Sequence, residues 1–374
     1  MSVEIILIAP LSAPSRRPRL AKMISTFVET GHQVRFYGWE RACGEMKTFA
    51  WEDKNVQEKA ILKGGGQVSS KTRAMYPLWM LAVFFCTLSL GRGQRIFCLG
   101  WETAFPALLA SFFTSSQIVF DDADRFSMII KLPNALTSVL QMLERWTSRN
   151  SALHIVPSMS RYDWQGPNMF ILQNTPTSKD IMAAERLAPQ RVPARLVVYA
   201  NGWLMDTRGA PTFYKSLEIL EDRGIAVRMH VAGMVDDNSM WGRKLISHKS
   251  VIFHGELPQR EALALYLTSD VALTFYDPDI PINRKAESNK WGDCICLRTP
   301  FIVNEEVETA TLFVRAGAAW AVPYHNPEAL ADFLELLSSN RQKLHEGQEA
   351  CRALQRVYTS FDEQVKKLLE KLAF

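Results

Sequence analysis

A run of acidic residues in the first half of the chain is a candidate for proton-transfer chemistry. Residues 120–125 read FDDADR and directly follow a short apolar stretch. Carboxylates that lie close together raise one another's pKa, which suits a carboxylate that has to take a proton from a hydroxyl group. We take Asp124, and after it Asp122, as the candidates for this role. The alternative is that these acids cap a following helix.

Two further groups of charged residues suit anionic ligands. Arg16, Arg17 and Arg19 lie in a polar loop after the first apolar run, where they could meet an anionic partner or form a solvated basic loop. Lys290 and Asp293 are three residues apart in the second half, so one turn of helix places both on the same face. A simple ion pair between them is the alternative.

The first half of the chain alternates between short apolar strands and longer helices. The segment 3–9 predicts a buried strand, the apolar positions of 20–29 recur at helical spacing, and 34–37 predicts the next strand. This alternation indicates a parallel sheet covered by helices on both faces. We expect further strands at 95–99, 117–120, 154–157 and 169–172, and helices at 103–113 and 131–148.

The second half repeats this organisation. We expect strands at 195–200, 226–232, 250–253, 271–275 and 299–304, with helices at 210–222, 260–268 and 327–339. The predicted division is a domain of residues 1–176, a linker at 177–194, a second domain at 195–350, and a helix within 351–374 that packs back toward the first domain. In doubly wound domains of this kind, ligands bind in the crevice at the carboxyl ends of the strands.

Composition excludes several classes of protein. A net charge of +4 over 374 residues is far below what a nucleic-acid-binding face requires. Cys294 and Cys296 lack a second pair of ligands at zinc spacing, and the six scattered cysteines favour a reducing compartment. The first residues show no basic region of a signal peptide, so we expect a cytoplasmic protein. The glycines at 64–66 lack the Lys-Ser/Thr ending of a P-loop.

The segment 76–90 is the most apolar part of the chain, and Lys71, Arg73, Arg92 and Arg95 flank it. It is shorter than the roughly 20 residues that a membrane-spanning helix needs. Two interpretations remain open: a buried core helix, or an interfacial helix that gives the protein a peripheral contact with the inner membrane. The basic flanks favour the second interpretation, because anionic lipid attracts cations.

Several short motifs, taken in their order and spacing, resemble the family 4 glycosyltransferases and their GT-B relatives. The resemblance covers nearly the whole chain and implies two Rossmann-like domains that face each other across a cleft, with an acceptor-binding first domain and a nucleotide-sugar-binding second domain. The motifs that carry it are RPR at 17–19, GHQV at 31–34, YANGW at 199–203, TRG at 207–209, NKWGD at 289–293, TP at 299–300 and YTSF at 358–361.

The resemblance also implies roles for particular residues of the second half. Arg208 and Lys290 match the family's cations that neutralise the diphosphate, and Asp293 stands where the family usually has a glutamate that binds the ribose. Lys285 replaces the second glutamate of the family, and Glu287 is the candidate substitute. Asn201 and Gly202 allow the backbone to approach the donor closely. Since no metal site is evident, we expect no metal cofactor.

In the first half, Ala123 stands where many relatives have a histidine, so an aspartate is the expected catalytic group. Arg16, Arg17 and Arg19 are expected to bind the acceptor. The implied function is transfer of a hexose-type sugar from a UDP- or GDP-sugar to a glycan acceptor that is carried on a lipid and destined for a surface polysaccharide. A nucleotide-sugar 2-epimerase of the same fold and a catalytically inactive scaffold of that fold are the alternatives.

Overall fold

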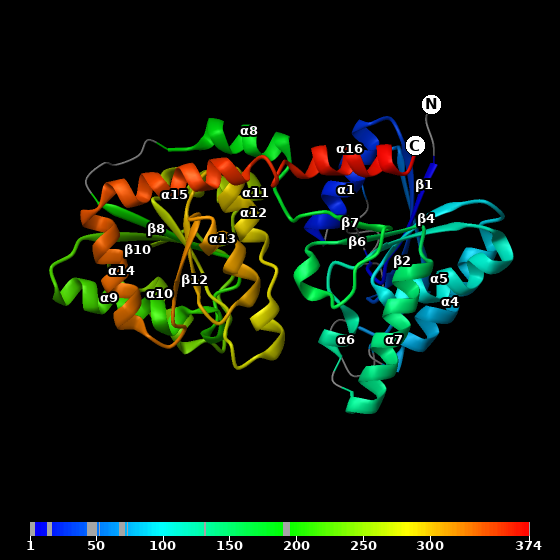
Figure 1. The fold of residues 1–374 in the computed structure, drawn as a ribbon, viewed down its shortest axis with the longest axis horizontal. Helices are drawn as coiled ribbons and strands as arrows, with labels where there is room; N and C mark the ends of the chain where they lie inside the picture. Colours follow the sequence, from blue (N-terminus) through cyan, green and yellow to red (C-terminus); the bar gives the residue numbers. More distant parts are fainter. Residues whose placement is uncertain are drawn as a thin grey trace. The chain divides into compact units, whose positions relative to one another are not determined.

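The computed structural model describes residues 4–12, 17–42, 51, 53–66, 72, 74–130, 132–189 and 195–373 of the chain. The chain divides into two compact units, which are drawn in Figure 1. Met1–Gln173 and Phe361–Phe374 form the first unit, and Asn174–Ser360 form the second. Each unit is built on a parallel sheet with helices packed against it, so the predicted α/β class with two doubly wound domains is confirmed.

The first unit contains a seven-stranded parallel sheet in the order β3-β2-β1-β4-β5-β6-β7. β1 lies inside the sheet, between β2 and β4, and is buried along most of its length, which explains its run of apolar residues. The strands are β1 (Glu4–Ile8), β2 (Gln33–Glu40), β3 (Val56–Lys63), β4 (Arg95–Leu99), β5 (Gln117–Asp121), β6 (Leu153–Val156) and β7 (Met169–Ile171).

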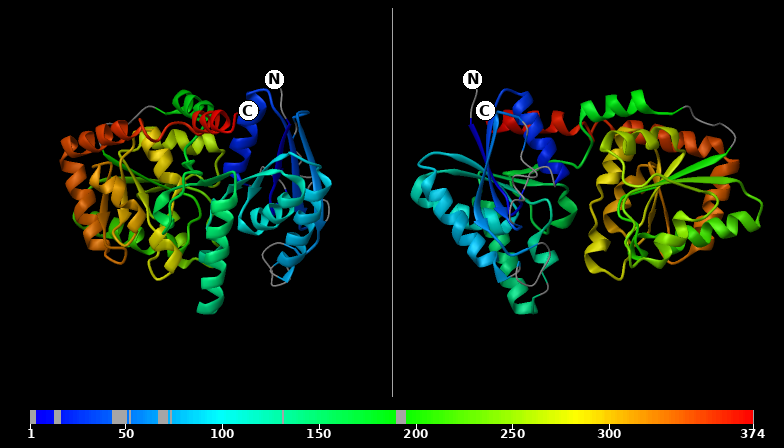
Figure 2. Two further views of the ribbon diagram at one scale, coloured as in Figure 1. Left: turned by 45° about the vertical axis from the view of Figure 1, so that its right-hand side comes forward. Right: turned by 180° about the vertical axis from the view of Figure 1, so that it is seen from behind.

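Helices cover both faces of this sheet. Alternate side chains of β1 enter two different clusters, one with α1 and α16 and the other with α4, α5 and α7. Figure 2 shows α16, in red, beside α1, in blue. The helices are α1 (Pro18–Glu29), α4 (Tyr76–Ser89), α5 (Trp101–Thr114), α6 (Phe126–Ile129), α7 (Asn134–Asn150) and α16 (Phe361–Lys371).

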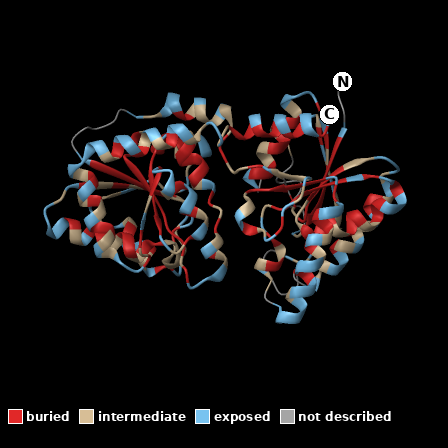
Figure 3. Cartoon of the chain, viewed as in Figure 1, coloured by how far each residue is buried: buried red, intermediate tan, exposed pale blue. Residues whose placement is uncertain are grey.

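The second unit contains a six-stranded sheet in the order β10-β9-β8-β11-β12-β13, again with parallel neighbours. The inner strands of both sheets are largely buried (Figure 3). Those of the second unit are β8 (Leu196–Asn201), β9 (Val227–Ala232), β10 (Val251–Phe253), β11 (Val271–Thr274), β12 (Phe301–Asn304) and β13 (Ala319–Val322).

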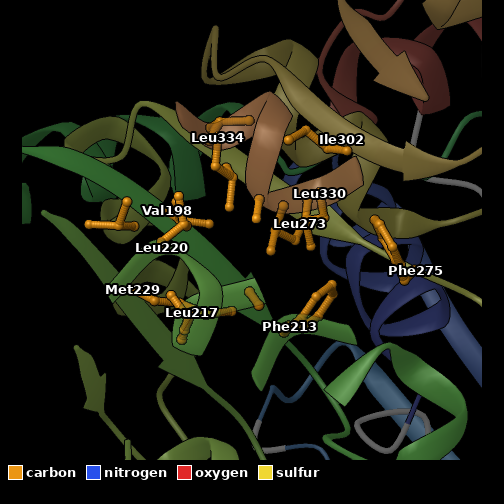
Figure 4. Packing of buried hydrophobic residues seen from close by; sticks show 14 of the residues in the cluster. Val198, Phe213, Leu217, Leu220, Met229, Leu273, Phe275, Ile302, Leu330 and Leu334 are labelled. Atoms are coloured by element: carbon orange, nitrogen blue, oxygen red, sulfur yellow. The ribbon is translucent and has the colours of Figure 1, made fainter. Parts of the chain in front are cut away.

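The helices of the second unit also lie on two faces. Val198, Leu273 and Ile302 of the sheet lie in one buried cluster with Phe213 of α9 and Leu330 of α14 (Figure 4). The opposite face packs against α8, α11, α12 and α13. The helices are α8 (Ser178–Leu187), α9 (Ala210–Asp222), α10 (Met240–Ile246), α11 (Gln259–Thr268), α12 (Asn289–Cys296), α13 (Thr311–Arg315), α14 (Pro327–Ser339) and α15 (Arg341–Leu354).

Several parts of the chain differ from the sequence-based expectation. The expected linker at 177–194 contains α8, which Thr177 caps by accepting a hydrogen bond from the Asp180 N–H, and whose Ala184 is buried. Strands β3 and β13 were not expected. For residues 351–374 we expected a single helix. The structure instead has two helices there: α15 of the second unit ends at Leu354, and after a turn α16 of the first unit begins at Phe361.

Candidate functional site

Asn201, the last residue of β8, and Gly202, which follows it, lie at the carboxyl end of the second sheet. The Gly202 N–H donates to the carbonyl of Ala232, which joins the loop after β8 to the end of β9. Gly202 has a φ of +103°, and a Cβ atom there would lie 3.2 Å from Cε and Nζ of Lys290. A glycine suits this backbone conformation, and the Lys290 ammonium group lies against the loop.

Arg208, in the turn before α9, and Lys290, in the first turn of α12, meet at one aromatic ring. The guanidinium carbon of Arg208 lies 4.5 Å from the centroid of the Tyr276 ring, and Nζ of Lys290 lies 5.7 Å from the same centroid. The Tyr276 hydroxyl donates to Ser288 Oγ at 2.7 Å, and its backbone N–H donates to Asn304 Oδ1 at 2.8 Å. These bonds fix the ring, so the two predicted cations are held together.

Each of these cations also stands beside the start of a helix. Gly209 joins Arg208 to Ala210, the first residue of α9, and Lys290 lies in the first turn of α12. Gly209 has a φ of +85°, and a Cβ atom on it would come within 2.7 Å of Phe213. The N–H groups and the dipole at a helix start favour anions. Two cations and two helix starts form a suitable site for a diphosphate.

Asp293 and Asn201 both lie near Tyr266. Asp293 is one turn after Lys290 in α12 and is buried. Burial raises the pKa of Tyr266 well above its usual value, and the Asp293 carboxylate adds to this shift. The Tyr266 hydroxyl donates to Asn201 Oδ1 at 3.0 Å. Tyr266 therefore connects the residue expected to bind the ribose with the loop that follows β8.

Glu287 lies near a different tyrosine. It is half-buried and directly precedes Ser288, which caps α12 by accepting a hydrogen bond from the Lys290 N–H. Burial raises the pKa of Tyr358, and the charge of Glu287 raises it further. The structure thus places Glu287 on the Tyr358 side of the start of α12.

Asp277, Asp279 and His325 form a cluster that could hold a metal ion. One ligand atom from each lies within 4.8 Å of the others. The Asp277 N–H donates to the carbonyl of Thr207, so the cluster lies beside the turn that carries Arg208. The side chains of Asp279 and His325 are 82% and 70% exposed, and exposed acidic groups are common without a bound ion. A metal-independent donor site therefore stays a prediction.

The first unit contains a pocket of about 770 Å³ at the carboxyl ends of β1, β4 and β5. Its lining combines charged side chains with a set of apolar ones, so it suits a ligand that has both polar and apolar parts. The charged residues of the lining are Arg17, Arg19, Arg41, Glu102 and Asp124, and the apolar ones include Leu20, Tyr76, Phe126, Ile129 and Ile130.

Asp124 and Arg17 meet at this pocket. Their side chains are about half exposed, and Arg17 Nη1 lies 3.7 Å from Asp124 Oδ2. Arg161 approaches the other carboxylate oxygen at 3.4 Å and also donates to the carbonyl of Ala123. Two of the residues predicted from the sequence are thus brought together. Arg16, also predicted, lies outside the described residues.

Arg19 has a different environment from the one we expected for an acceptor-binding residue. Its guanidinium group is buried, and its Nε and Nη2 donate to the carboxylate of Asp121 at 3.0–3.3 Å. Its Nη1 donates to the carbonyl of Leu172 at 2.8 Å. Arg19 therefore joins α1 to the ends of β5 and β7, although part of it reaches the pocket lining.

Asp122 is also buried, with 1% of its surface exposed. The Tyr162 hydroxyl donates to its Oδ2 at 2.8 Å, whereas among the described residues no hydrogen-bond donor reaches its Oδ1. Burial raises the pKa of Glu102 and Glu144, and the Asp122 carboxylate adds to each shift. The structure thus places Asp122 behind the pocket as a source of negative charge, not at the pocket surface.

Glu102 is the residue that the sequence analysis missed. It lies in the first turn of α5, is buried, and lines the pocket. Burial is the main cause that raises its pKa to about 7, and Asp122 contributes. Gly100, with a φ of +80°, leaves room for it, because a Cβ atom there would lie 2.7 Å from the carboxylate. The sequence signal that could have identified Glu102 is an acidic residue that follows a buried strand and a glycine.

Comparison with known proteins identifies the fold. No protein-family model and no curated protein matches the sequence. A glycosyltransferase from Rickettsia africae is similar in structure, with 12% identity, a TM-score of 0.67, and coverage of 99% of this chain and 97% of that one. A trehalose-6-phosphate protein from E. coli bound with UDP-2-fluoro glucose has 9% identity, a TM-score of 0.67, and coverage of 99% and 98%.

A putative UDP-N-acetylglucosamine 2-epimerase from Listeria monocytogenes is also similar, with 13% identity, a TM-score of 0.61, and coverage of 98% of this chain and 95% of that one. At these identities the likeness establishes the fold alone. The chain has the GT-B fold, as its resemblance to GT-B enzymes predicted.

Proposed function

We propose that the protein is a glycosyltransferase that uses a nucleotide-diphosphate sugar as donor. The observation that carries this proposal is the meeting of Arg208 and Lys290 at Tyr276, next to the starts of α9 and α12. A leaving nucleoside diphosphate develops negative charge, and preorganised cations and helix starts stabilise it. The GT-B fold supports the proposal, since a protein of this fold binds UDP-2-fluoro glucose.

In the donor site, Arg208 and Lys290 neutralise the diphosphate, and the backbone at Asn201 and Gly202 lies close to the donor. Asp293 holds the ribose, with Glu287 as a further donor-binding residue before the helix start. The donor is a UDP- or GDP-hexose, and no metal ion is needed because the two side-chain cations take its place.

The acceptor binds in the pocket of the first unit, where Arg17 and Asp124 orient it. Glu102 takes the proton of the acceptor hydroxyl. As the acceptor oxygen bonds to C1 of the sugar, the bond from C1 to the phosphate oxygen breaks and its electron pair leaves with the diphosphate. The apolar part of the pocket lining favours an acceptor carried on a lipid. We assign the protein to surface polysaccharide synthesis at the cytoplasmic face of a membrane.

Nucleotide binding tests the donor site without knowledge of the acceptor. We would measure the melting temperature with UDP, GDP, CMP, TDP and ADP, each in large excess. One diphosphate at a hundredfold excess over its Kd should raise the melting temperature by roughly 5–10 °C. Lys290→Ala and Arg208→Ala should remove most of this rise.

Lys343→Ala is the matched control, because Lys343 also lies over an aromatic ring of the second unit, 5.8 Å from the centroid of Trp320. It should leave the rise unchanged. If none of the nucleotides stabilises the wild type, the donor site is refuted and an inactive scaffold of this fold becomes the better interpretation.

A nucleotide-sugar 2-epimerase is the second candidate, and one observation favours it. Glu102 lines the pocket, has a pKa of about 7, and lies near Asp122, so protons can be exchanged there. An epimerase would exchange the hydrogen at C2 of UDP-N-acetylglucosamine with deuterium from D2O when no acceptor is present. A glycosyltransferase would leave that hydrogen in place, so mass spectrometry of the recovered sugar nucleotide separates the two functions.

A further inference from the structure

Helices α4, α5 and α7 of the first unit carry large apolar side chains that face solvent. Phe85 is 63% exposed, Phe113 is 70% exposed and Met142 is 62% exposed. These values are high for apolar residues, and exposed clusters of this kind mark interaction surfaces. We call the following set the apolar face: Leu78, Leu81 and Phe85 of α4, Phe112 and Phe113 of α5, and Leu136, Val139 and Met142 of α7.

Ring contacts show that this surface is continuous from helix to helix. Phe84 contacts Phe85 on α4 and Phe113 on α5, with ring centroids 5.5 and 6.4 Å apart. Phe112 contacts Trp146 on α7, at 6.3 Å. Leu136, Val139 and Met142 recur every three residues along α7, so they lie along one side of that helix. The apolar face therefore spans three helices and is wider than the apolar segment 76–90.

Within the described residues of α4, α5 and α7, the exposed charged side chains are basic. Within α4, α5 and α7 as described, the two acids are Glu102 and Glu144, and both are buried. Arg145 and Arg149 of α7 are exposed, and so is Arg92, in the turn that bonds to the end of α5 through Gly93 N–H and Thr114 O. Lys71, Arg73 and Lys131 add further basic residues to the neighbouring sequence.

We infer that the apolar face docks on the surface of a lipid bilayer that contains anionic headgroups. Apolar side chains would enter the boundary between headgroups and acyl chains, while the arginines at the rim would bind phosphates. A second copy of the chain fits less well, because a symmetric contact would bring the same arginines together. In the part of the chain that the structure describes, no helix is long and apolar enough to cross a membrane.

This docking would place the pocket of the first unit beside the lipid. Ile129, which is 53% exposed, lines the pocket and directly precedes the segment that leads into α7. Tyr76, the first residue of α4, also lines the pocket. An acceptor with a lipid tail could keep the tail in the bilayer while its polar end reaches Arg17 and Asp124. This last step rests on the proposed function, whereas the docking itself does not.

Co-sedimentation of the full chain with vesicles tests the inference. Vesicles of equal parts phosphatidylcholine and phosphatidylglycerol should bind the wild type, and vesicles of phosphatidylcholine alone should bind it much more weakly. Leu81→Ser and Phe85→Ser should each lower the partition coefficient roughly tenfold. Arg145→Gln should lower it about fivefold on the anionic vesicles.

Leu312→Ser is the matched control, because Leu312 of the second unit is 56% exposed and Leu81 is 55% exposed. It should bind vesicles as the wild type does. Equal binding to both kinds of vesicle would overturn the role of anionic lipid, and no binding to either would overturn the docking. Light scattering that shows a dimer sensitive to Phe85→Ser would assign the apolar face to a second copy. Nucleotide binding, measured in parallel, reports separately on the donor site.

Discussion

At the scale of single residues, burial of Glu102 makes ionisation of its carboxyl group unfavourable and so gives the group a pKa suited to proton transfer. Its carboxyl group is buried, and the buried Asp122 carboxylate nearby disfavours its ionisation further. The resulting pKa of about 7 lets the group both release and accept a proton near neutral pH. The ordinary value of 4.5 applies in the unfolded chain, so the difference makes stability depend on pH.

The sign of this dependence gives the first prediction. Between pH 4.5 and 7 the folded state holds a proton on Glu102 that the unfolded state has lost, so stability falls as the pH rises through this range and the full loss is present above it. Glu102→Gln cannot ionise, so it should be more stable than the wild type by about 3 kcal/mol at pH 8 and nearly equal at pH 4. Urea unfolding at both pH values measures this.

Glu29→Gln, at the exposed end of α1, should change stability little at either pH and serves as the control. Destabilisation by Glu102→Gln at pH 8 would show that the carboxylate has a stabilising partner. If Glu102 also moves the acceptor proton, transfer should fall by roughly 10²–10⁴-fold in this variant, and the wild-type rate should be half-maximal near pH 7.

The sequence indicated some of the candidate residues better than others. Arg208 and Lys290 were predicted from short motifs, and the structure holds both at Tyr276. Arg19 looked like one of several equal arginines of a polar loop, because the sequence does not show that Asp121 lies opposite it. Glu102 was missed for a related reason: its raised pKa comes from burial and from Asp122, which is distant in the chain.

At the scale of elements, α12 shows how one cap residue can position a functional side chain. Ser288 accepts a hydrogen bond from the Lys290 N–H and another from the Tyr276 hydroxyl. It therefore fixes both the start of the helix and the ring at which Arg208 and Lys290 meet. Gly292 adds close packing, since a Cβ atom there would lie 2.1 Å from the carbonyl oxygen of Asn174.

The second prediction follows from this cap. Ser288→Ala should destabilise the second unit by about 1–2 kcal/mol and should also weaken nucleotide binding, because Tyr276 loses its partner. Asn326→Ala removes the cap of α14, where the Asn326 side chain accepts from the Ala329 N–H. It should cost a similar amount of stability and leave nucleotide affinity unchanged. Chemical unfolding and calorimetric titration measure the two effects, and equal affinity losses in both variants would refute this role of Ser288.

Most buried strands could be predicted, because their apolar runs and the helices between them have distinct periods. β3 escaped prediction since it lies at the edge of its sheet and includes the exposed Gln57 and Lys59 and the half-buried Glu58. β13 is also an edge strand, and it is only four residues long. Edge strands are covered on fewer sides, so they carry weaker apolar patterns than central strands.

At the scale of the whole molecule, the core of the first unit is completed by residues far away in the sequence. Helix α16 buries four side chains in the cluster that contains Ile5, Leu7 and the apolar side chains of α1; they are Phe361, Val365, Leu368 and Leu369. The side chain of Gln364 accepts a hydrogen bond from the Gln173 N–H at 2.8 Å. The sequence indicated a helix that returns to the first domain, but not which side chains would fill the core.

The third prediction concerns the independence of the two units. Phe361→Ala should destabilise the first unit by about 3–5 kcal/mol, because Phe361 is fully buried there. Hydrogen exchange followed by mass spectrometry should show lost protection in β1 and α1 and retained protection in β8 and α9. Phe301→Ala, in the core of the second unit, should give the reverse pattern. Equal loss of protection in both units for either variant would show that they unfold together.

The position of α16 has a consequence for how the protein is made. A ribosome releases the residues of β1 early, but residues 361–371 emerge only after all of the second unit has been synthesised. Domains usually fold in the order in which they leave the ribosome. Here the second unit can close while the first still lacks one helix and exposes Ile5, Leu7 and Phe27. The N-terminal half of this protein should therefore be the last to finish folding, and the part that chaperones protect longest.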